Sequence, residues 1–183
     1  YRVGILSQPS WLVGYSKDDE NFAIGRGRYI REDILCGEIP KRDIVEVPPL
    51  PIDPDATLRE RMRITESQAC WACHSFMNPQ GLAFEFYDHF GRYRITEAGK
   101  PVDASGWLDG TGDQDGDFSN HMELMQKLAN SKTTEACFVS HSLQYFLGGE
   151  EKAGLGSSQV QPFIETYRSS GGNYLETIVQ MMS

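Results

Sequence analysis

The chain has 183 residues, of which 39% are hydrophobic and 23% charged, and its formal net charge at pH 7 is −9. This size suits one domain with a hydrophobic core, and no apolar run approaches the roughly 20 residues of a membrane-spanning helix. The acidic balance argues against nucleic acid or an anionic membrane as partner and would suit a basic redox protein. The chain begins at Tyr1 without a basic-then-apolar leader, so we take it as a mature protein or an excised domain.

The first third of the chain is expected to contain a loop, one helix and a proline-rich strap. Residues 1–25 hold Pro9 and several glycines and are expected to be loop. Apolar residues recur on one side of a helix from Arg26 to Cys36, which Gly37 would end. Five prolines in residues 37–55 predict an extended, polyproline-like strap.

Further helices are expected along the rest of the chain. Asp55 or Thr57 would cap a helix over 58–67, and a short helix would follow over 68–76. Other predicted elements are a helix with an aromatic face over 81–90, a hairpin over 92–105 that turns at 98–101, a Gly/Asp loop over 106–117, and helices over 120–130, 133–148, 157–169 and 174–182. The fold class is therefore expected to be mainly α.

One short motif carries a specific chemistry. Cys70-Trp71-Ala72-Cys73-His74 is a C-x-x-C-H sequence. Two thiols on one helical turn can reach the two vinyl groups of a haem, and His74 can bind its iron through a ring nitrogen. A thioredoxin-like pair would need a βαβ context, and none precedes Cys70; a zinc site would need a second close Cys/His pair, and the sequence has none. We therefore expect one covalently attached haem c.

The two other cysteines, Cys36 and Cys137, are either a disulfide or two buried thiols. We favour the disulfide, because c-type haem proteins usually mature in an oxidising compartment and unpaired thiols are unusual in secreted proteins. Such a bridge would close a loop of about 100 residues.

Three side chains are candidates for the sixth iron ligand. Met122 is the first candidate, Met125 the second, and His121 an imidazole alternative. Phe118, Met122, Met125 and Leu128 also recur at helical spacing, which is typical of an ordinary core stripe.

Other side chains could surround the haem. Arg92 and Arg94, with Arg28 next, are the candidates for pairing with the propionates; solvated strand arginines are the equal alternative for Arg92 and Arg94. The expected walls of the macrocycle, or simply core residues, are Trp71, Phe84, Tyr87 and Phe90.

The acidic loop 109–117 suggests calcium but fails as an EF-hand, because Phe118 and Leu124 stand where that loop needs Gly and Glu. A solvated turn is favoured over another kind of calcium loop.

The chain resembles a known family nearly end to end, and three stretches carry most of the resemblance. Residues 26–36 match R-G-x-x-(I/V)-R-E-x-(L/I)-L-C, residues 77–94 are similar to (M/I)-(D/N)-P-x-G-x-x-x-E-x-(F/Y)-D-x-x-G-R-(Y/W)-R, and Cys137 with 145–148 falls where the family has C-x7-Y-A-x-G-R. The family comprises the C-terminal cytochrome-c-like regions of large secreted proteins abundant in planctomycetes, myxobacteria and some marine proteobacteria. One departure is Gly149, where an Arg is usual.

This resemblance implies a periplasmic or secreted monohaem cytochrome domain, joined to other domains of a larger parent protein. It also strengthens the Cys36–Cys137 pairing, because both positions match family cysteines. Some relatives carry carbohydrate-binding modules, which implies a link to extracellular polysaccharide metabolism.

We therefore expect one cytochrome-c-like helical domain over 1–183, with an N-terminal extension and strap in 1–56 and a haem-binding core with extra C-terminal helices in 57–183. Its expected function is one-electron transfer rather than catalysis. The alternative is a peroxidase-like haem oxidoreductase with an open sixth iron position. A haem-based sensor or structural module is a third class, for which the sequence offers no support.

Overall fold

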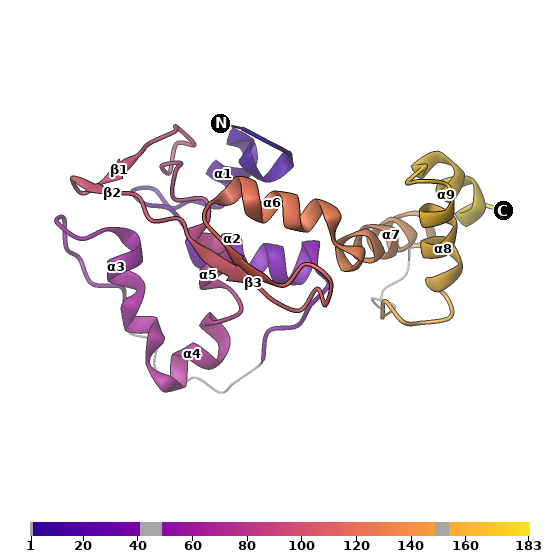
Figure 1. Cartoon of the computed structure of the whole chain (residues 1–183), viewed down its shortest axis with the longest axis horizontal. Helices are drawn as coiled ribbons and strands as arrows, with labels where there is room; N and C mark the ends of the chain where they lie inside the picture. The colour runs from indigo at the N-terminus through magenta and orange to yellow at the C-terminus, as the bar shows by residue number, and fades with distance from the viewer. Residues whose placement is uncertain (1, 41–48, 149–153) are drawn as a thin grey trace.

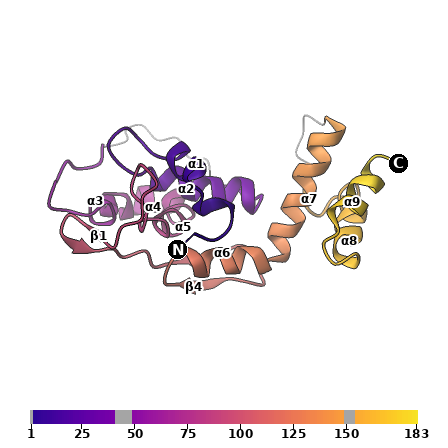
Figure 2. The same ribbon diagram turned by 90° about the horizontal axis from the view of Figure 1, so that it is seen from above.

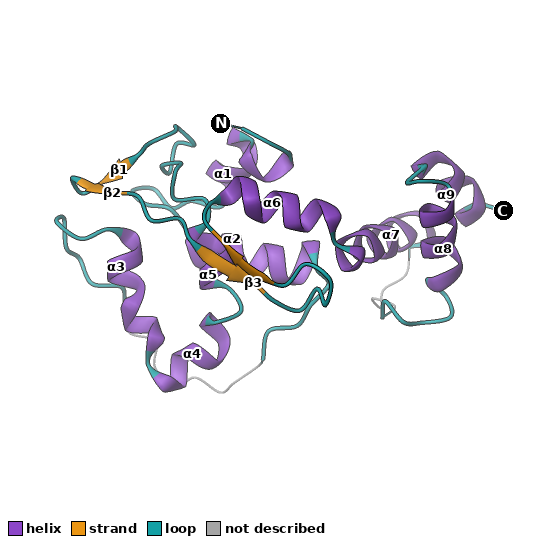
Figure 3. Ribbon diagram, in the orientation of Figure 1, coloured by secondary structure: helices purple, strands orange, loops and turns teal. Residues whose placement is uncertain are grey.

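The computed structural model describes residues 2–40, 49–148 and 154–183, and helices dominate it (Figure 1, Figure 3). The mainly α class is confirmed. The elements in chain order are η1 (Ile5–Ser7), α1 (Pro9–Gly14), α2 (Ala23–Tyr29), η2 (Ile30–Ile34), α3 (Leu58–Met62), η3 (Arg63–Glu66), α4 (Gln68–His74), α5 (Asn78–Leu82), β1 (Thr96–Glu97), β2 (Lys100–Pro101), β3 (Gly106–Leu108), β4 (Gly116–Phe118), α6 (His121–Asn130), α7 (Lys132–Leu147), α8 (Gln161–Ser169) and α9 (Tyr174–Met181).

The N-terminal segment is more ordered than expected. The prediction of loop over 1–25 was wrong, because Pro9 occupies the first turn of α1, where a missing backbone N–H costs nothing. The next helix, α2, already begins at Ala23 and continues through the π-helical η2. The helical segment ends at Ile34, two residues before the predicted end, and Cys36, with φ of 51°, then turns the chain in the left-handed region.

The strap and the helices after it follow the sequence pattern. Residues 37–40 and 49–53 have no regular secondary structure, whereas 41–48, with Pro48, lie outside the described residues. Thr57 caps α3 in a reciprocal capping box with Glu60.

The prediction of a helix over 81–90 was wrong. The helix α5 begins at Asn78 and ends at Leu82, because Pro79 sits in its first turn and the chain beyond Ala83 turns repeatedly. The aromatic side chains of Phe84 and Tyr87 are buried from these turns rather than from one helical face. The chain then reverses at Gly91, whose φ is +73°.

Two short antiparallel ladders follow. Strands β1 and β2 form the predicted hairpin, and its turn residues Ala98 and Gly99 have φ of 48° and 73°, as a two-residue type I′ turn requires. The prediction of a loop over 106–117 was wrong at both ends of that range, since residues 106–108 form β3 and pair with β4 at 116–118. Only the acidic segment between these strands is loop.

The C-terminal helices are close to their predicted positions. Asn120 caps α6, Ser131 caps α7, and α7 stops at Gly148 in the left-handed conformation. Figure 2 shows α7 leading away from the rest of the molecule to α8 and α9.

Three clusters of buried apolar side chains hold these elements together. The largest joins α1, η2, residues 83–87, β3, β4 and α6, and a second lies among α7, α8 and α9. The third brings Ala23 of α2 against Leu58 and Met62 of α3 and Leu82 of α5. Chain before residue 57 therefore packs directly on chain after it, and the boundary placed at 56/57 stays a prediction. Within the described ranges, no helix combines the length and the hydropathy needed to cross a membrane.

Candidate functional site

The C-x-x-C-H motif lies on α4, at one edge of the molecule (Figure 1). All seven residues of this helix are described and none is fully buried. Cys70 and Cys73 are half-buried and outside the disulfide. A helix in mid-chain normally buries one face against a core, so α4 lacks the covering that its neighbours have.

Helical geometry orders the side chains around α4. Successive residues of an α-helix are about 100° apart, so His74 lies about 40° from Cys70, Trp71 about 100° on the same side, and Cys73 about 60° on the other side. Cys70 and His74 therefore occupy the helix face between Trp71 and Cys73.

Trp71 lines a cavity of about 870 Å³ on one side of this face. Trp107 of β3 lies across from it, with the two ring centroids 6.0 Å apart in an edge arrangement. Apolar side chains supply part of the wall, and Arg59 and Glu123 add charge. The lining residues are Arg59, Met62, Glu66, Trp71, Asn78, Pro79, Leu82, Ser105, Gly106, Trp107, Asp117, Phe118, Ser119 and Glu123.

Cys73 lines a second cavity, of about 750 Å³, on the other side. Its thiol donates a weak hydrogen bond to the carbonyl oxygen of Pro40 at 3.1 Å. Tyr15, Tyr29 and Arg28 contribute to the opposite wall. Both volumes are in the range that protein cavities for cofactor-sized ligands have.

A chain of buried polar groups lies behind His74. Its Nδ1 is 3.0 Å from Oδ1 of Asn78, and Nδ2 of Asn78 donates to Oγ1 of Thr65 at 2.8 Å. The Thr65 hydroxyl donates to the carbonyl oxygen of Met62 at 2.7 Å. Asn78, Thr65 and Met62 are all buried. This contact leaves the other ring nitrogen of His74, Nε2, for an external ligand.

The donor set fits a covalent haem. Two free thiols and one imidazole share one helix, and the side chains from Cys70 to His74 are only half-buried and are flanked by two cavities. These are the groups that c-type haem attachment uses.

The arginines expected to meet the propionates have protein partners. Arg92 donates to Asp88 at 2.8 Å, and Arg94 contacts Glu85 at 2.6 Å and Glu97 at 3.5 Å. Arg28 is likewise paired with Glu32 at 2.7 Å. Their role toward a haem stays a prediction.

Of the three predicted arginines, Arg28 lines the cavity beside Cys73. Two arginines that the sequence did not single out also lie near the motif. Arg59 lines the cavity beside Trp71, and Arg31 stacks over the ring of Phe76 at 5.0 Å, just after α4. Trp107 was also missed, since no pattern signals that β3 brings it to Trp71.

Of the aromatic residues expected to wall the haem, Trp71 lines a cavity beside the motif. Phe84 and Tyr87 are 0% exposed within the largest core cluster, whereas Phe90 is 59% exposed.

The three candidate sixth ligands lie on or near the start of α6. Met122 is 42% exposed, and Met125 is buried in the largest core cluster. The Nε2 atom of His121 lies 3.1 Å from the Tyr87 hydroxyl, and the ring is buried. Among the described residues, none of these three lines either cavity beside α4.

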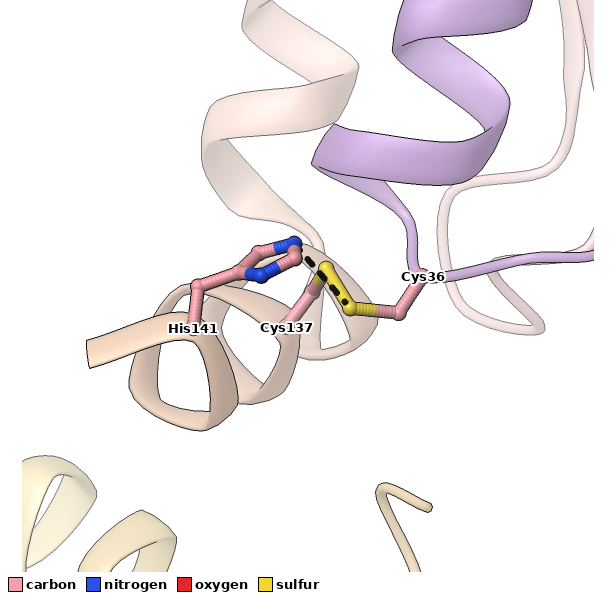
Figure 4. Close-up of side chains that lie close together, drawn as sticks. All are labelled: Cys36, Cys137 and His141. Atoms are coloured by element: carbon pink, nitrogen blue, oxygen red, sulfur yellow. Dashed lines mark hydrogen bonds between the residues drawn. A yellow bond between two sulfur atoms is a disulfide. The ribbon is translucent and has the colours of Figure 1, made fainter. Parts of the chain in front are cut away.

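Cys36 and Cys137 form the predicted disulfide, with their α-carbons 5.5 Å apart. Figure 4 shows His141 beside the disulfide; it lies one turn after Cys137 on α7. The Nε2 atom of His141 is 3.6 Å from the sulfur of Cys36. The same Nε2 donates to the carbonyl oxygen of Asp33 at 3.1 Å. The bridge ties the end of η2 to α7 across 101 positions of sequence.

A buried charge network joins α2 to the chain after α5. Arg26, 0% exposed, donates to Asn21 at 2.9 Å, and Asn21 in turn donates to Glu85. Desolvation lowers the pKa of Arg26 to about 10, although the charge of Glu85 opposes this shift. Burial raises the pKa of Glu85, against the lowering effect of Arg26 and Arg94. These groups support the helix that packs against the chain after α4.

Hydrogen bonds within the acidic loop and from the start of α7 hold the loop in place. Asp115 accepts from the backbone and hydroxyl of Thr111 at 2.8 and 2.7 Å, and Asp113 accepts from the backbone of Lys132 at 3.0 Å. These contacts are those of a structured turn at the start of α7. Gly149, the position that departs from the resembled family, lies outside the described residues.

Comparison with known proteins finds one family. The family model PSCyt3, described as "Protein of unknown function (DUF1588)", matches residues 2–97, which include α2, the strap and the C-x-x-C-H helix. No curated protein and no solved structure matches the chain.

Proposed function

Because the chain belongs to the PSCyt3 family, we propose that it is a monohaem c-type cytochrome domain that transfers single electrons between partners outside the cytoplasm. The name of the family hints at a cytochrome, and the sequence motif supplies the chemistry that such a name needs. Within this proposal the helices form a cytochrome-c-like fold enlarged by the strap and by α7, α8 and α9.

The proposal depends above all on one observation. The C-x-x-C-H motif is on a helix that presents both thiols and the imidazole, has no buried residue, and lies between two cavities. A zinc or thioredoxin-like use of the two cysteines would not require a half-exposed helix between two cavities of this size. A porphyrin attached there would cover it.

The roles of the residues follow from their chemistry. Cys70 and Cys73 would form the thioether links, and His74 would bind the iron through Nε2. A haem held in this way supplies one-electron oxidation and reduction. Trp71 and Trp107 would exclude water from one side. Arg59 lines that cavity while it contacts Asp103 and Ser105, so it would have to share its guanidinium with any negatively charged group bound there.

The site of action is argued from two features. The Cys36–Cys137 disulfide suits an oxidising compartment, so we place the protein in the periplasm or outside the cell. The net charge of −9 would favour a basic redox partner, whose encounter would weaken as salt is added. The link to extracellular polysaccharide metabolism rests on the family resemblance alone.

The alternative is a peroxidase-like oxidoreductase with an open sixth iron position. It is favoured by the placement of two of the candidate ligands away from the cavities beside α4. His121 is engaged with Tyr87, Met125 is packed in the largest core cluster, and neither lines a cavity beside α4. If no side chain closes the iron, small ligands will bind it.

Absorption spectroscopy tests both functions. The chain should be produced in a host with a cytochrome c maturation system, beside a Cys70→Ser/Cys73→Ser variant as control. We expect a haem spectrum for the wild-type chain that survives denaturation, and no covalent haem on the variant. Carbon monoxide should leave the reduced spectrum unchanged if the domain is a simple electron carrier. Prompt binding of carbon monoxide would support the open-site alternative instead, and a colourless wild-type protein would refute both.

A further inference from the structure

We propose that Asn78, held in place by Thr65, is the positioning residue that fixes the ring tautomer of His74 and so sets the reduction potential of the site. This inference rests on the proposed function of His74 as the iron ligand. It concerns the buried row of groups behind His74: Asn78, Thr65 and the backbone carbonyl of Met62.

The direction of each hydrogen bond in the row can be deduced from its inner end. The carbonyl oxygen of Met62 can only accept, so the single hydroxyl hydrogen of Thr65, 2.7 Å away, points toward it. The hydroxyl oxygen of Thr65 is then left to accept, and the group 2.8 Å from it must be the donating Nδ2 of Asn78. A flipped amide would place two acceptors against each other.

The outer end of the row follows from this orientation. With Nδ2 turned to Thr65, the amide oxygen Oδ1 of Asn78 faces Nδ1 of His74 at 3.0 Å. An amide oxygen only accepts, so Nδ1 carries the hydrogen and Nε2 keeps its lone pair. This is the tautomer in which the imidazole can bind a metal through Nε2.

Burial makes this arrangement rigid. The exposed fractions of Met62, Thr65 and Asn78 are 2%, 8% and 4%. Water therefore has little access to replace any one partner. Asn78 also opens α5, directly before Pro79, so its backbone is fixed by the same turn that follows α4.

The chemical identity of the acceptor gives the inference its measurable content. A neutral amide draws the Nδ1 hydrogen less strongly than a carboxylate would, so it leaves the imidazole a weaker electron donor. A carboxylate of the same shape would fit with the Thr65 hydroxyl turned from Met62 to donate to it. It would make His74 a stronger donor and favour the oxidised iron. The reduction potential should therefore fall in Asn78→Asp.

The experiment compares matched variants of the haem-loaded protein by redox titration. Asn78→Asp should change the ratio of oxidised to reduced protein at a given potential by about tenfold, which is about 59 mV for a one-electron couple. Asn173→Asp is the control: it makes the same chemical change at the N-cap of α9, where Asp serves as well, and should leave the potential unchanged.

A second pair of variants keeps the test informative if Asn78→Asp does not fold. Thr65→Ser retains the hydroxyl and should keep the wild-type potential, whereas Thr65→Val removes the acceptor for Nδ2 and should shift it. In the haem-free protein, nitrogen NMR of His74 should show hydrogen on Nδ1 in the wild type and a second tautomer in Thr65→Val.

The outcomes separate the two proposals. Haem attached with an unchanged potential in Asn78→Asp and Thr65→Val would overturn the inference and leave the proposed function standing. Hydrogen on Nε2 in the haem-free wild type would also overturn the inference. A wild-type chain that attaches no haem would overturn the proposed function, and with it the role of Asn78.

Discussion

The backbone of Gly27 in α2 lies directly against the carbonyl group of Met77, three residues after His74. A Cβ atom on residue 27 would overlap the carbonyl oxygen and carbon of Met77. Gly81 of α5 has the same relationship to the carbonyl of Ala23. The two helices therefore cross at backbone-to-backbone distance, and this crossing holds the chain that leaves the C-x-x-C-H helix.

Gly27→Ala should destabilise the protein by about 2–3 kcal/mol, because the backbone of Met77 must move to admit the methyl group. Gly14→Ala is the matched control: a Cβ there meets nothing within 4 Å, and alanine suits its helical position. Chemical denaturation of both variants measures the difference. Equal stabilities would show that α2 and α5 are not in backbone contact.

Arg26 and Arg28 make a second matched pair on α2. Arg26 is fully buried within the network that reaches Glu85, so Arg26→Met should cost about 3–5 kcal/mol by leaving polar and charged groups unpaired. The side chain of Arg28 is 65% exposed and pairs with Glu32 on the surface, so Arg28→Met should change stability by less than about 0.5 kcal/mol. Urea unfolding curves of the two variants measure both changes in the free energy of unfolding. A small effect of Arg26→Met would contradict the assigned network.

The disulfide should account for a large share of stability. Closing a loop of about 100 residues stabilises a protein by about 4–5 kcal/mol in the chain-entropy account. Cys36→Ser/Cys137→Ser should therefore lower the melting temperature strongly, and treatment of the wild type with a thiol reductant should reproduce the loss. An unchanged melting temperature after verified reduction would argue against the bridge as a stabilising element.

The acidic loop should respond to acid and not to calcium. Desolvation raises the pKa of Asp115, but hydrogen bonds from Thr111 outweigh it and the net pKa is lowered. The stability that Asp115 contributes is thus present above its unfolded pKa of about 4 and is lost as pH falls through the lower folded value. Asp115→Asn should lose less stability than the wild type between about pH 5 and pH 3.

Calcium supplies the complementary measurement on the same loop. Asp113 and Asp115 already accept hydrogen bonds from the protein, so millimolar calcium should leave the melting temperature unchanged. A clear rise on adding calcium, abolished in Asp115→Asn, would mean that the loop is a cation site.

Sequence reasoning predicted the elements whose signals are local. The cap at Thr57 was one of two candidates, and the hairpin turn at Ala98 and Gly99 and the stop at Gly148 were readable, because capping and turn chemistry depends on a few adjacent residues. The aromatic run after Gly81 led to a wrong prediction. The spacing of its aromatic residues is typical of one helical face, but in the structure a series of turns buries the rings of Phe84 and Tyr87.

In the candidate site too, the sequence predicted the local features and missed the contacts that depend on tertiary packing. The thiols and imidazole of α4 are contiguous in sequence and were recognised at once, and the Cys36–Cys137 pair was favoured from compartment and resemblance. The contact of Trp107 with Trp71 and the row from His74 to Thr65 depend on tertiary packing, which no periodicity reveals. Whether Met122, Met125 or His121 closes the iron stays a prediction.

Mass spectrometry of one tryptic peptide tests the central claim most directly. Cleavage at lysine and arginine should release residues 64–92, which hold Cys70, Cys73 and His74 together. After production with a cytochrome c maturation system, this peptide should carry the mass of one haem bound through both cysteines. The same peptide recovered without added haem, its two thiols free or oxidised to each other, would contradict the account.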